Sequence, residues 1–226
     1  MAEFVLESKA RMAVCNIMRE LKEQGLNRGA EGNVSVRFGE GFLISPTGVV
    51  PEDMLPQQVV YMDMNGHYEG AWKPSSEWRM HLAIYRERKE AQAVVHTHSE
   101  HVTALSCLRE PMPPFHYMVA IAGGSIIDCA TYATFGSEEL VENMLKALGP
   151  RRAAMLANHG LICFHDTLEK AAQLAQQIES LAKQYLLARA VGEPKRLTDA
   201  EMAEVLKKFS GYGQQADVGV EPDGGE

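Results

Sequence analysis

The sequence predicts a layered α/β fold with a largely antiparallel sheet, in a single domain. Several segments carry apolar residues at helical spacing, and the shorter segments between them have the composition of strands. Short turns join some of these strands, which is typical of antiparallel pairing. Because the 226 residues show no internal repeat or linker, we expect one domain over residues 1–213, followed by an acidic, glycine-rich and mobile tail over 214–226.

The first half of the chain begins with a long predicted helix and continues in short strands. Residues 4–24 place apolar side chains such as Met12 and Leu21 at helical spacing, and the run stops near Gly25. The small residues of 29–33 then predict a loop. Alternating or continuous apolar residues predict strands at 34–38, 42–44 and 59–62.

The second half of the chain mixes helices and strands. A helix is expected to open at Ser75 and run to about Arg88, because serine is a favoured N-cap residue and Glu77 suits the positive end of the helix dipole. Ser137 begins another helix for the same reason. Further helices are predicted at 167–190 and 199–209. Extended segments are predicted at 93–98, 126–129, 153–156 and 161–164.

Charge and hydropathy argue against two classes of partner. The formal net charge of −8 is the opposite of what nucleic-acid binding requires. No apolar run approaches the roughly 18 residues of a membrane span, and residues 1–9 lack the features of a signal peptide. We therefore expect a cytoplasmic protein without nucleic-acid or membrane partners. An anionic substrate remains compatible with the charge, because phosphate sites use local backbone N–H groups and helix ends.

Two histidines at the end of a predicted strand suggest a metal site. His96 and His98 are two positions apart, so on a strand their side chains point to the same face and can meet at one ion. The pair alone fits two histidines at a strand edge equally well. His159, in a tight Asn-His-Gly turn, would complete a three-histidine set that leaves coordination positions open for substrate. Glu77 is a fourth candidate, although its pattern alone fits an ordinary carboxylate at a helix start.

Three segments have the composition of an anion site. Residues 29–33 combine glycines with a side-chain amide, Thr47 and Gly48 form a second loop, and Ser75 and Ser76 stand at a predicted helix N-terminus. Free N–H groups and the helix dipole attract anions at such places. Each segment alone is a common turn or cap, and only their occurrence together with the metal candidates suggests a phosphate site.

Seven ordered motifs run along the chain: GNVSVR at 32–37, SPTG at 45–48, SSEWR at 75–79, VVHTH at 94–98, HYM at 116–118, YATFG at 132–136 and NHGLI at 158–162. In this order and at these separations they resemble the class II aldolase and ribulose-phosphate epimerase superfamily, most closely its L-fuculose-1-phosphate aldolase branch. The resemblance extends from residue 5 to about residue 213. One departure is Ala30, which stands where the branch has threonine.

The resemblance implies a fold, a metal and two sets of ligands. The implied fold is the three-layer α/β/α arrangement of class II aldolases, with the largely antiparallel sheet at its centre. The implied metal is Zn²⁺, which Mn²⁺ or Co²⁺ could replace, held by His96, His98, His159 and Glu77. The implied phosphate site consists of Asn33, Thr47, Gly48, Ser75 and Ser76.

The resemblance also implies a reaction and an assembly. Such an enzyme cleaves a ketose 1-phosphate reversibly into dihydroxyacetone phosphate and an aldehyde. Candidate substrates are L-fuculose 1-phosphate, 5-deoxyribulose 1-phosphate and 5-(methylthio)ribulose 1-phosphate. Glu77 would move a proton on the three-carbon half, and Tyr117 would act as proton donor from a neighbouring subunit of a homotetramer with shared active sites. The aldehyde side would be lined by Phe135, Phe209 and Tyr212.

Two other enzyme activities and one non-catalytic function occur within the same superfamily. A sugar-phosphate 4-epimerase should carry an aspartate in the stretch at 116–118, which here reads HYM and has no acid. A methylthioribulose-1-phosphate dehydratase uses a similar metal site but should differ in its acid–base residues, and Tyr117 is of the aldolase type. A non-catalytic, adducin-like binding module should have lost metal ligands, whereas all four candidates are present. The sequence therefore favours the aldolase.

Overall fold

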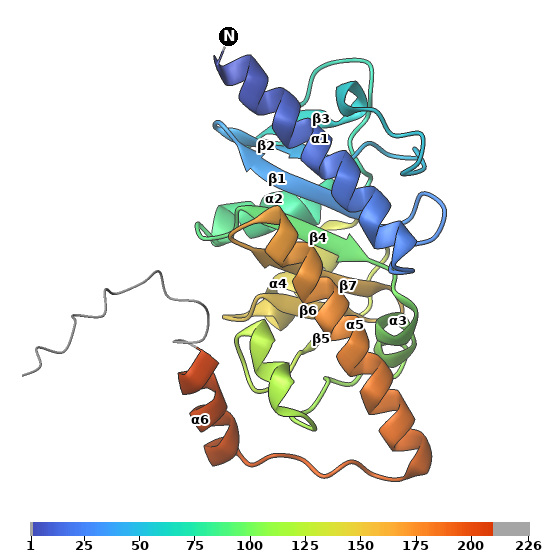
Figure 1. Ribbon diagram of the computed structural model, residues 1–226, viewed down its shortest axis with the longest axis vertical. Coiled ribbons are helices and arrows are strands. Elements are labelled where there is room, and N and C mark those ends of the chain that lie inside the picture. The colour runs from blue at the N-terminus through green and yellow to red at the C-terminus, as the bar shows by residue number, and fades with distance from the viewer. Residues whose placement is uncertain (1, 210–226) are drawn as a thin grey trace, which may run out of the picture.

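A seven-stranded sheet is the centre of the computed structural model, which describes residues 2–209 (Figure 1). The strand order is β3-β2-β1-β4-β7-β6-β5, and every neighbouring pair is antiparallel except β5 with β6. The strands are β1 (Asn33–Phe38), β2 (Gly41–Ile44), β3 (Val60–Asp63), β4 (Ala93–Thr97), β5 (Cys129–Ala130), β6 (Ala153–Leu156) and β7 (Gly160–His165). The predicted antiparallel sheet is confirmed.

Helices cover both faces of this sheet, which confirms the three-layer α/β/α fold. Figure 1 shows α1 and α5 across one face, with α2 and α4 behind the sheet. The α-helices are α1 (Ala2–Glu23), α2 (Trp78–Glu87), α3 (Glu100–Ser106), α4 (Glu138–Leu148), α5 (Leu168–Val191) and α6 (Asp199–Phe209). Two short 3₁₀ helices are η1 (Pro56–Gln58) and η2 (Tyr117–Ala122). None of the described helices is long and apolar enough to span a lipid bilayer.

Successive residues of the two central strands point into opposite cores. Val94 of β4 and Ile162 of β7 are buried in the cluster that includes α2 and α4, whereas Val95 and Leu161 are buried in the cluster that includes α1, α3 and α5. Both faces of these strands are therefore covered, which explains their nearly continuous apolar sequence. The end of β4 is consequently a rigid support for the residues that follow it.

Side-chain caps explain where two of the helices begin. The Ser137 hydroxyl accepts a hydrogen bond from the Leu140 N–H at 3.1 Å and opens α4, as the sequence predicts. Thr167 caps α5 in the same way, through the Lys170 N–H at 3.2 Å. Unpaired N–H groups at these helix starts are thus satisfied within the chain.

The predicted start of α2 at Ser75 is wrong, because the helix begins at Trp78. The Ser75 N–H is hydrogen-bonded to the Ser45 carbonyl at 3.0 Å, and its hydroxyl accepts from the Glu77 N–H at 3.3 Å. These contacts hold the serine in a loop against the segment after β2. Glu77 occupies the N-cap position but its carboxylate makes no capping hydrogen bond. The carboxylate is therefore available to the interior.

Other predicted boundaries differ from the structure at short elements. The strand predicted to reach His98 ends at Thr97. Within the extended segment predicted at 126–129, Ile127 makes only an isolated bridge to Met112, and the paired strand β5 is Cys129–Ala130. Helix α3 was not predicted, because its seven residues are too few for a clear helical period. Tyr212 and the tail at 214–226 lie outside the described residues, so the domain boundary at 213 stays a prediction.

Candidate metal centre and anion cavity

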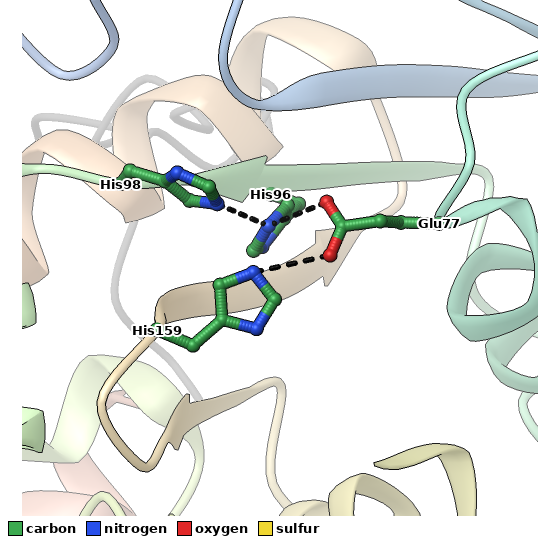
Figure 2. Close-up of side chains that lie close together, drawn as sticks. All are labelled: Glu77, His96, His98 and His159. Carbon is green, nitrogen blue, oxygen red and sulfur yellow. Dashed lines mark hydrogen bonds and ion pairs between the residues drawn. The ribbon is translucent and has the colours of Figure 1, made fainter. Parts of the chain in front are cut away.

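The four candidate metal ligands meet at one point of the structure. One donor atom from each of Glu77, His96, His98 and His159 lies within 4.8 Å of the others. Figure 2 shows the three imidazoles and the carboxylate pointing toward one another. The three imidazole centroids are each 4.8 Å from the other two, so the rings form an equilateral triangle. This arrangement is what a single ion held by three imidazoles requires.

The antiparallel pairing of β4 with β7 brings distant histidines together. Thr97 is opposite Leu161, so the turn before β7 lies beside the residues that end β4. This turn contains Asn158 in the left-handed conformation, at φ 55°, followed by His159 and Gly160. A Cβ atom on Gly160 would collide with the Thr97 carbonyl oxygen and come within 3.3 Å of the His98 Cα. Only glycine allows this close approach.

The hydrogen bonds of His96 bring several unshared electron pairs of the cluster close together. Its Nδ1 lies 2.7 Å from the Leu161 carbonyl oxygen, which can only accept, so Nδ1 carries the proton. In the neutral ring Nε2 then presents a lone pair, and it lies 2.9 Å from His98 Nε2 and 3.0 Å from Glu77 Oε2. Lone pairs at such separations repel one another unless a proton or a metal ion lies among them. The donor set therefore fits a metal ion.

Burial and charge set the protonation of the cluster. Burial by itself raises the pKa of the Glu77 carboxyl, but the facing His96 and His159 imidazoles hold that pKa well below its usual range. Burial and the neighbouring His96 and His159 lower the pKa of His98 to about 3. A carboxylate beside a neutral imidazole is the form in which both groups bind a metal. Oxygen and imidazole nitrogen donors suit divalent transition-metal ions.

One oxygen of Glu77 has no hydrogen bond in the described structure. Glu77 Oε1 is buried and lies 3.1 Å from His159 Nε2, without the geometry of a hydrogen bond. The other oxygen, Oε2, accepts a hydrogen bond from the Asn33 side-chain amide at 3.0 Å. A buried carboxylate oxygen without a donor is costly. Its position toward the imidazole triangle gives a second reason to place a cation there.

The cluster opens onto a cavity of about 340 Å³. Glu77, His98 and His159 line it, whereas His96 lies fully buried behind them. All of the candidate phosphate ligands line the same cavity: Asn33, Thr47, Gly48, Ser75 and Ser76. The structure thus brings together two sets of residues that the sequence placed in separate segments.

Hydrogen-bond donors without a partner lie on the wall of the same cavity. Within residues 2–209, the N–H groups of Gly48 and Ser76 and the hydroxyls of Thr47 and Ser76 make no hydrogen bond. The Ser75 hydroxyl accepts a hydrogen bond from the Glu77 N–H and can still donate its own proton to an anion. Converging neutral donors of this kind bind an anion without requiring a basic side chain.

The predicted residues of the aldehyde side are not all at this cavity. Phe135 lines its rim and is 68% exposed. Tyr117, at the start of η2, and Phe209, at the end of α6, instead line a second cavity of about 720 Å³. Tyr212 lies outside the described residues. Within one chain, therefore, Tyr117 and Phe209 are not among the residues that line the cavity of the metal cluster.

Sequence reasoning missed the residue that holds His98. The buried Asn27 side chain accepts a hydrogen bond from the His98 N–H at 3.0 Å through Oδ1. A Cβ atom at Gly32, which has φ 68°, would collide with the Asn27 side chain. Asn27 thereby joins the loop before β1 to the end of β4. Its sequence context shows nothing beyond a polar residue near a turn, so no local signal identified it.

Other residues of the cavity wall were also not predicted. Tyr132, Asn158 and Glu31 line the cavity. Tyr132 and Asn158 do lie within motifs of the sequence, but no role was attached to them. Glu31 is half exposed, and its Oε2 lies 3.9 Å from His98 Nδ1.

Comparisons of the sequence and of the structure with known proteins agree on one family. A profile described as "Class II Aldolase and Adducin N-terminal domain" matches residues 12–186. The L-fuculose phosphate aldolase of Escherichia coli O6:H1 (strain CFT073) is 47% identical over 207 residues, covering 91% of this chain and 96% of that protein. The 5-methylthioribulose-1-phosphate/5-deoxyribulose-1-phosphate aldolase of Rhodospirillum rubrum is 45% identical over 212 residues, covering 94% and 96%. A solved L-fuculose 1-phosphate aldolase superposes with a TM-score of 0.86 at 39% identity, covering 89% and 96%.

Replacing Gly160 by alanine tests whether the close approach of β7 to β4 positions the cluster. The new Cβ would push against Thr97 and displace His98, so we expect Gly160→Ala to weaken Zn²⁺ binding by roughly tenfold or more. Competition with a chromophoric chelator measures this affinity. Gly192→Ala is the matched control, because nothing lies within 4 Å of the added atom. Equal Zn²⁺ affinities for both variants and the wild type would contradict the role of Gly160.

Proposed function

The chain belongs to the class II aldolase and adducin family, and from this premise we propose that its site cleaves a ketose 1-phosphate reversibly into dihydroxyacetone phosphate and an aldehyde. One observation carries the proposal. A set of metal-binding donors and a group of free anion-binding donors open onto the same cavity of about 340 Å³. Such a cavity can hold a phosphate at one end and the reacting oxygens at the other.

The names of the relatives define a class of substrate. One acts on L-fuculose phosphate, and another on 5-methylthioribulose 1-phosphate and 5-deoxyribulose 1-phosphate. These sugars share the three-carbon phosphorylated half and differ at the aldehyde end. We assign the shared half to the cavity between Thr47 and the metal cluster, and the variable end to the rim at Phe135. Cytoplasm is the proposed location.

We assign Zn²⁺, replaceable by Mn²⁺ or Co²⁺, to His96, His98, His159 and Glu77. When bound there, the metal supplies positive charge that stabilises the negative charge developing on the substrate oxygens. Other groups of the chain hold the ligands in position. The Leu161 carbonyl fixes the tautomer of His96, and the Asn27 amide fixes the backbone of His98.

The phosphate is assigned to Asn33, Thr47, Gly48, Ser75 and Ser76. Free N–H and hydroxyl donors at Gly48, Thr47 and Ser76 can surround its oxygens. The net charge of the chain is −8, so no excess of basic side chains attracts an anion. Neutral donors can still bind one, because they form direct hydrogen bonds to its oxygens. Ala30, at the wall of the same cavity, offers no hydroxyl, so its backbone alone can contribute.

Glu77 and Tyr117 divide the proton transfers between them. Glu77 is proposed as a metal ligand only in the resting site, and substrate would displace it. In the direction of condensation, the Glu77 carboxylate takes a proton from a carbon of dihydroxyacetone phosphate. The carbon–carbon bond then forms to the aldehyde, and the Tyr117 phenol donates a proton to the aldehyde oxygen, which becomes a hydroxyl. The proton on Glu77 then passes through solvent to the Tyr117 phenolate, which restores both groups. Cleavage runs through the same steps in reverse. A carboxylate and a phenol differ in proton affinity, which suits these two roles.

Tyr117 is proposed to act in the site of a neighbouring subunit. It is half exposed and lines a cavity with Phe209 rather than the cavity of the metal cluster. A homotetramer with shared active sites would bring this face against a neighbour's cavity, where Phe209 and Tyr212 would join Phe135 at the aldehyde side.

Removal of the metal tests the reaction directly. Treatment with a chelator should abolish release of dihydroxyacetone phosphate from a panel of ketose 1-phosphates, and Zn²⁺, Mn²⁺ or Co²⁺ should restore it. A coupled assay for dihydroxyacetone phosphate measures the rate, and the panel ranks L-fuculose, 5-deoxyribulose and 5-(methylthio)ribulose 1-phosphates. Full activity in metal-free protein would reject the proposed function. A product with the carbon skeleton intact would indicate an epimerase or a dehydratase.

The replacement Glu77→Gln tests whether Glu77 is the catalytic base, because it keeps the shape of the side chain and removes its charge. The amide cannot accept a proton, so we expect kcat to fall by about 10²-fold or more. Measuring bound metal alongside the rate separates lost catalysis from lost metal. Glu87→Gln, at the exposed end of the same helix, is the matched control and should retain the wild-type rate. A Glu77→Gln enzyme with full metal content and wild-type kcat would remove Glu77 from the chemistry.

Mixed oligomers test whether Tyr117 serves a neighbouring subunit. Tyr117→Phe and Glu77→Gln should each be nearly inactive alone, because each site then lacks one acid–base group. Co-refolding equal amounts should restore about one quarter of wild-type activity, since one site in four then combines an intact Glu77 with an intact neighbouring Tyr117. A coupled assay before and after mixing measures the recovery. No recovery in verified mixed oligomers would place both groups in the same chain.

A further inference from the structure

A line of buried polar side chains leads from the interior of the protein to Glu77. Its members are Tyr85, Ser35, His81, Asn33 and Glu77, and none is more than 6% exposed. Asn33 and Ser35 are two positions apart on β1, so they point to the same face of the sheet. Glu77, His81 and Tyr85 follow one another at intervals of four along α2 and its N-cap, so they share one face of the helix. The two rows interleave where α2 packs on the sheet.

Hydrogen bonds join the two rows into one continuous chain. The Tyr85 hydroxyl lies 2.8 Å from Ser35 Oγ, and Ser35 Oγ lies 2.7 Å from His81 Nδ1. His81 Nε2 lies 2.5 Å from Asn33 Oδ1, and Asn33 Nδ2 lies 3.0 Å from Glu77 Oε2. Every link is thus within hydrogen-bond distance, and both ends of the Asn33 amide are engaged.

The charge of Glu77 identifies the donor and the acceptor of every hydrogen bond in the chain. A carboxylate can only accept, so Asn33 must turn its NH₂ group toward Glu77 and its carbonyl oxygen toward His81. His81 must then donate from Nε2, and its Nδ1 must accept from the Ser35 hydroxyl. Ser35 in turn accepts from Tyr85. Reversing the chain would place the Asn33 oxygen against the carboxylate, where two acceptors repel.

We infer that His81 is a positioning residue for catalysis, because it holds the carbonyl oxygen of Asn33 and so keeps the amide NH₂ directed at Glu77 and the substrate cavity. The inference rests on the proposed function, since Asn33 lines the cavity assigned to the phosphate. An Asn33 held in this orientation presents an N–H donor, and not an acceptor, to an anion. The same amide donates to Glu77 Oε2, so one side chain connects the phosphate end of the cavity with the base.

The surroundings of His81 support a neutral ring with one proton. Burial, followed by the neighbouring His96, lowers the pKa of His81 to about 3. A neutral imidazole has one donor and one acceptor, which is what the chain of hydrogen bonds requires at this position. Buried polar groups are costly unless all are satisfied, and an apolar side chain of the same volume would fill the space between β1 and α2 without this cost. The polar chain is therefore best explained by its effect on Asn33 and Glu77.

Two substitutions at His81 separate positioning from packing. His81→Phe keeps a planar ring but cannot donate to Asn33, whereas His81→Gln carries both an N–H donor and an oxygen acceptor. We expect His81→Phe to lower kcat/KM by roughly tenfold or more and to raise the inhibition constant of inorganic phosphate by a similar factor. His81→Gln should recover most of both losses. Phe164→Leu, a buried change in the same core outside the polar chain, should lower the melting temperature while leaving phosphate inhibition unchanged.

The tautomer of His81 provides a test in the wild-type protein. Long-range ¹H–¹⁵N NMR spectra of histidine-labelled protein should show His81 protonated on Nε2 and unprotonated on Nδ1, with Ser35→Ala identifying its signals. A proton on Nδ1, or wild-type kinetics and phosphate inhibition in His81→Phe, would overturn the inference, as would equal losses in His81→Phe and His81→Gln. If the wild type cleaves no ketose 1-phosphate, the proposed function fails instead, and the tautomer still decides the orientation of Asn33.

Discussion

The structure depends on one electrostatic constraint, which is the convergence of unshared electron pairs at the end of β4. His96 directs Nε2 at His98 and at Glu77 because the Leu161 carbonyl holds the proton on Nδ1. His96 and Glu77 are buried and His98 is partly buried, so water screens their repulsion only weakly, and a proton or a metal ion among them would stabilise them. The sheet keeps them together because β4 is paired on both sides and covered on both faces. A protein of this fold can therefore maintain a strongly polar cluster within a rigid apolar support.

The cluster and the anion cavity are coupled through the segment around Glu77. The loop at Ser75 is held against Ser45, which delays the start of α2 and leaves the Glu77 carboxylate without a capping role. The same loop exposes the free donors of Ser76 to the cavity. One local departure from regular helix geometry thus supplies both a candidate metal ligand and a candidate phosphate site. In a protein of net charge −8, neutral donors of this kind would allow an anion to bind without a basic surface.

The distribution of aromatic residues divides the proposed reaction between chains. The cavity of the metal cluster contains the residues proposed for the phosphorylated three-carbon half, whereas Tyr117 lines a different cavity with Phe209. A proton donor on another subunit would complete the site only on assembly. The reactive half is then held by one rigid chain, and the variable aldehyde half meets residues from a neighbour. Relatives named for different sugar phosphates differ in that half of their substrates.

The sequence by itself determined the local features: the extent of the long helices, the serine cap of α4, the shared face of His96 and His98, and the ordered motifs that resemble one superfamily. These follow from residues a few positions apart. Only the tertiary structure decided that α2 begins at Trp78, that Asn27 holds His98, and that His81 engages Asn33. The two side-chain contacts join residues 71 and 48 positions apart, and the start of α2 depends on a loop held by another segment. Local propensity carries no information about such pairs, because the sheet pairing and the packing of α2 on β1 create them.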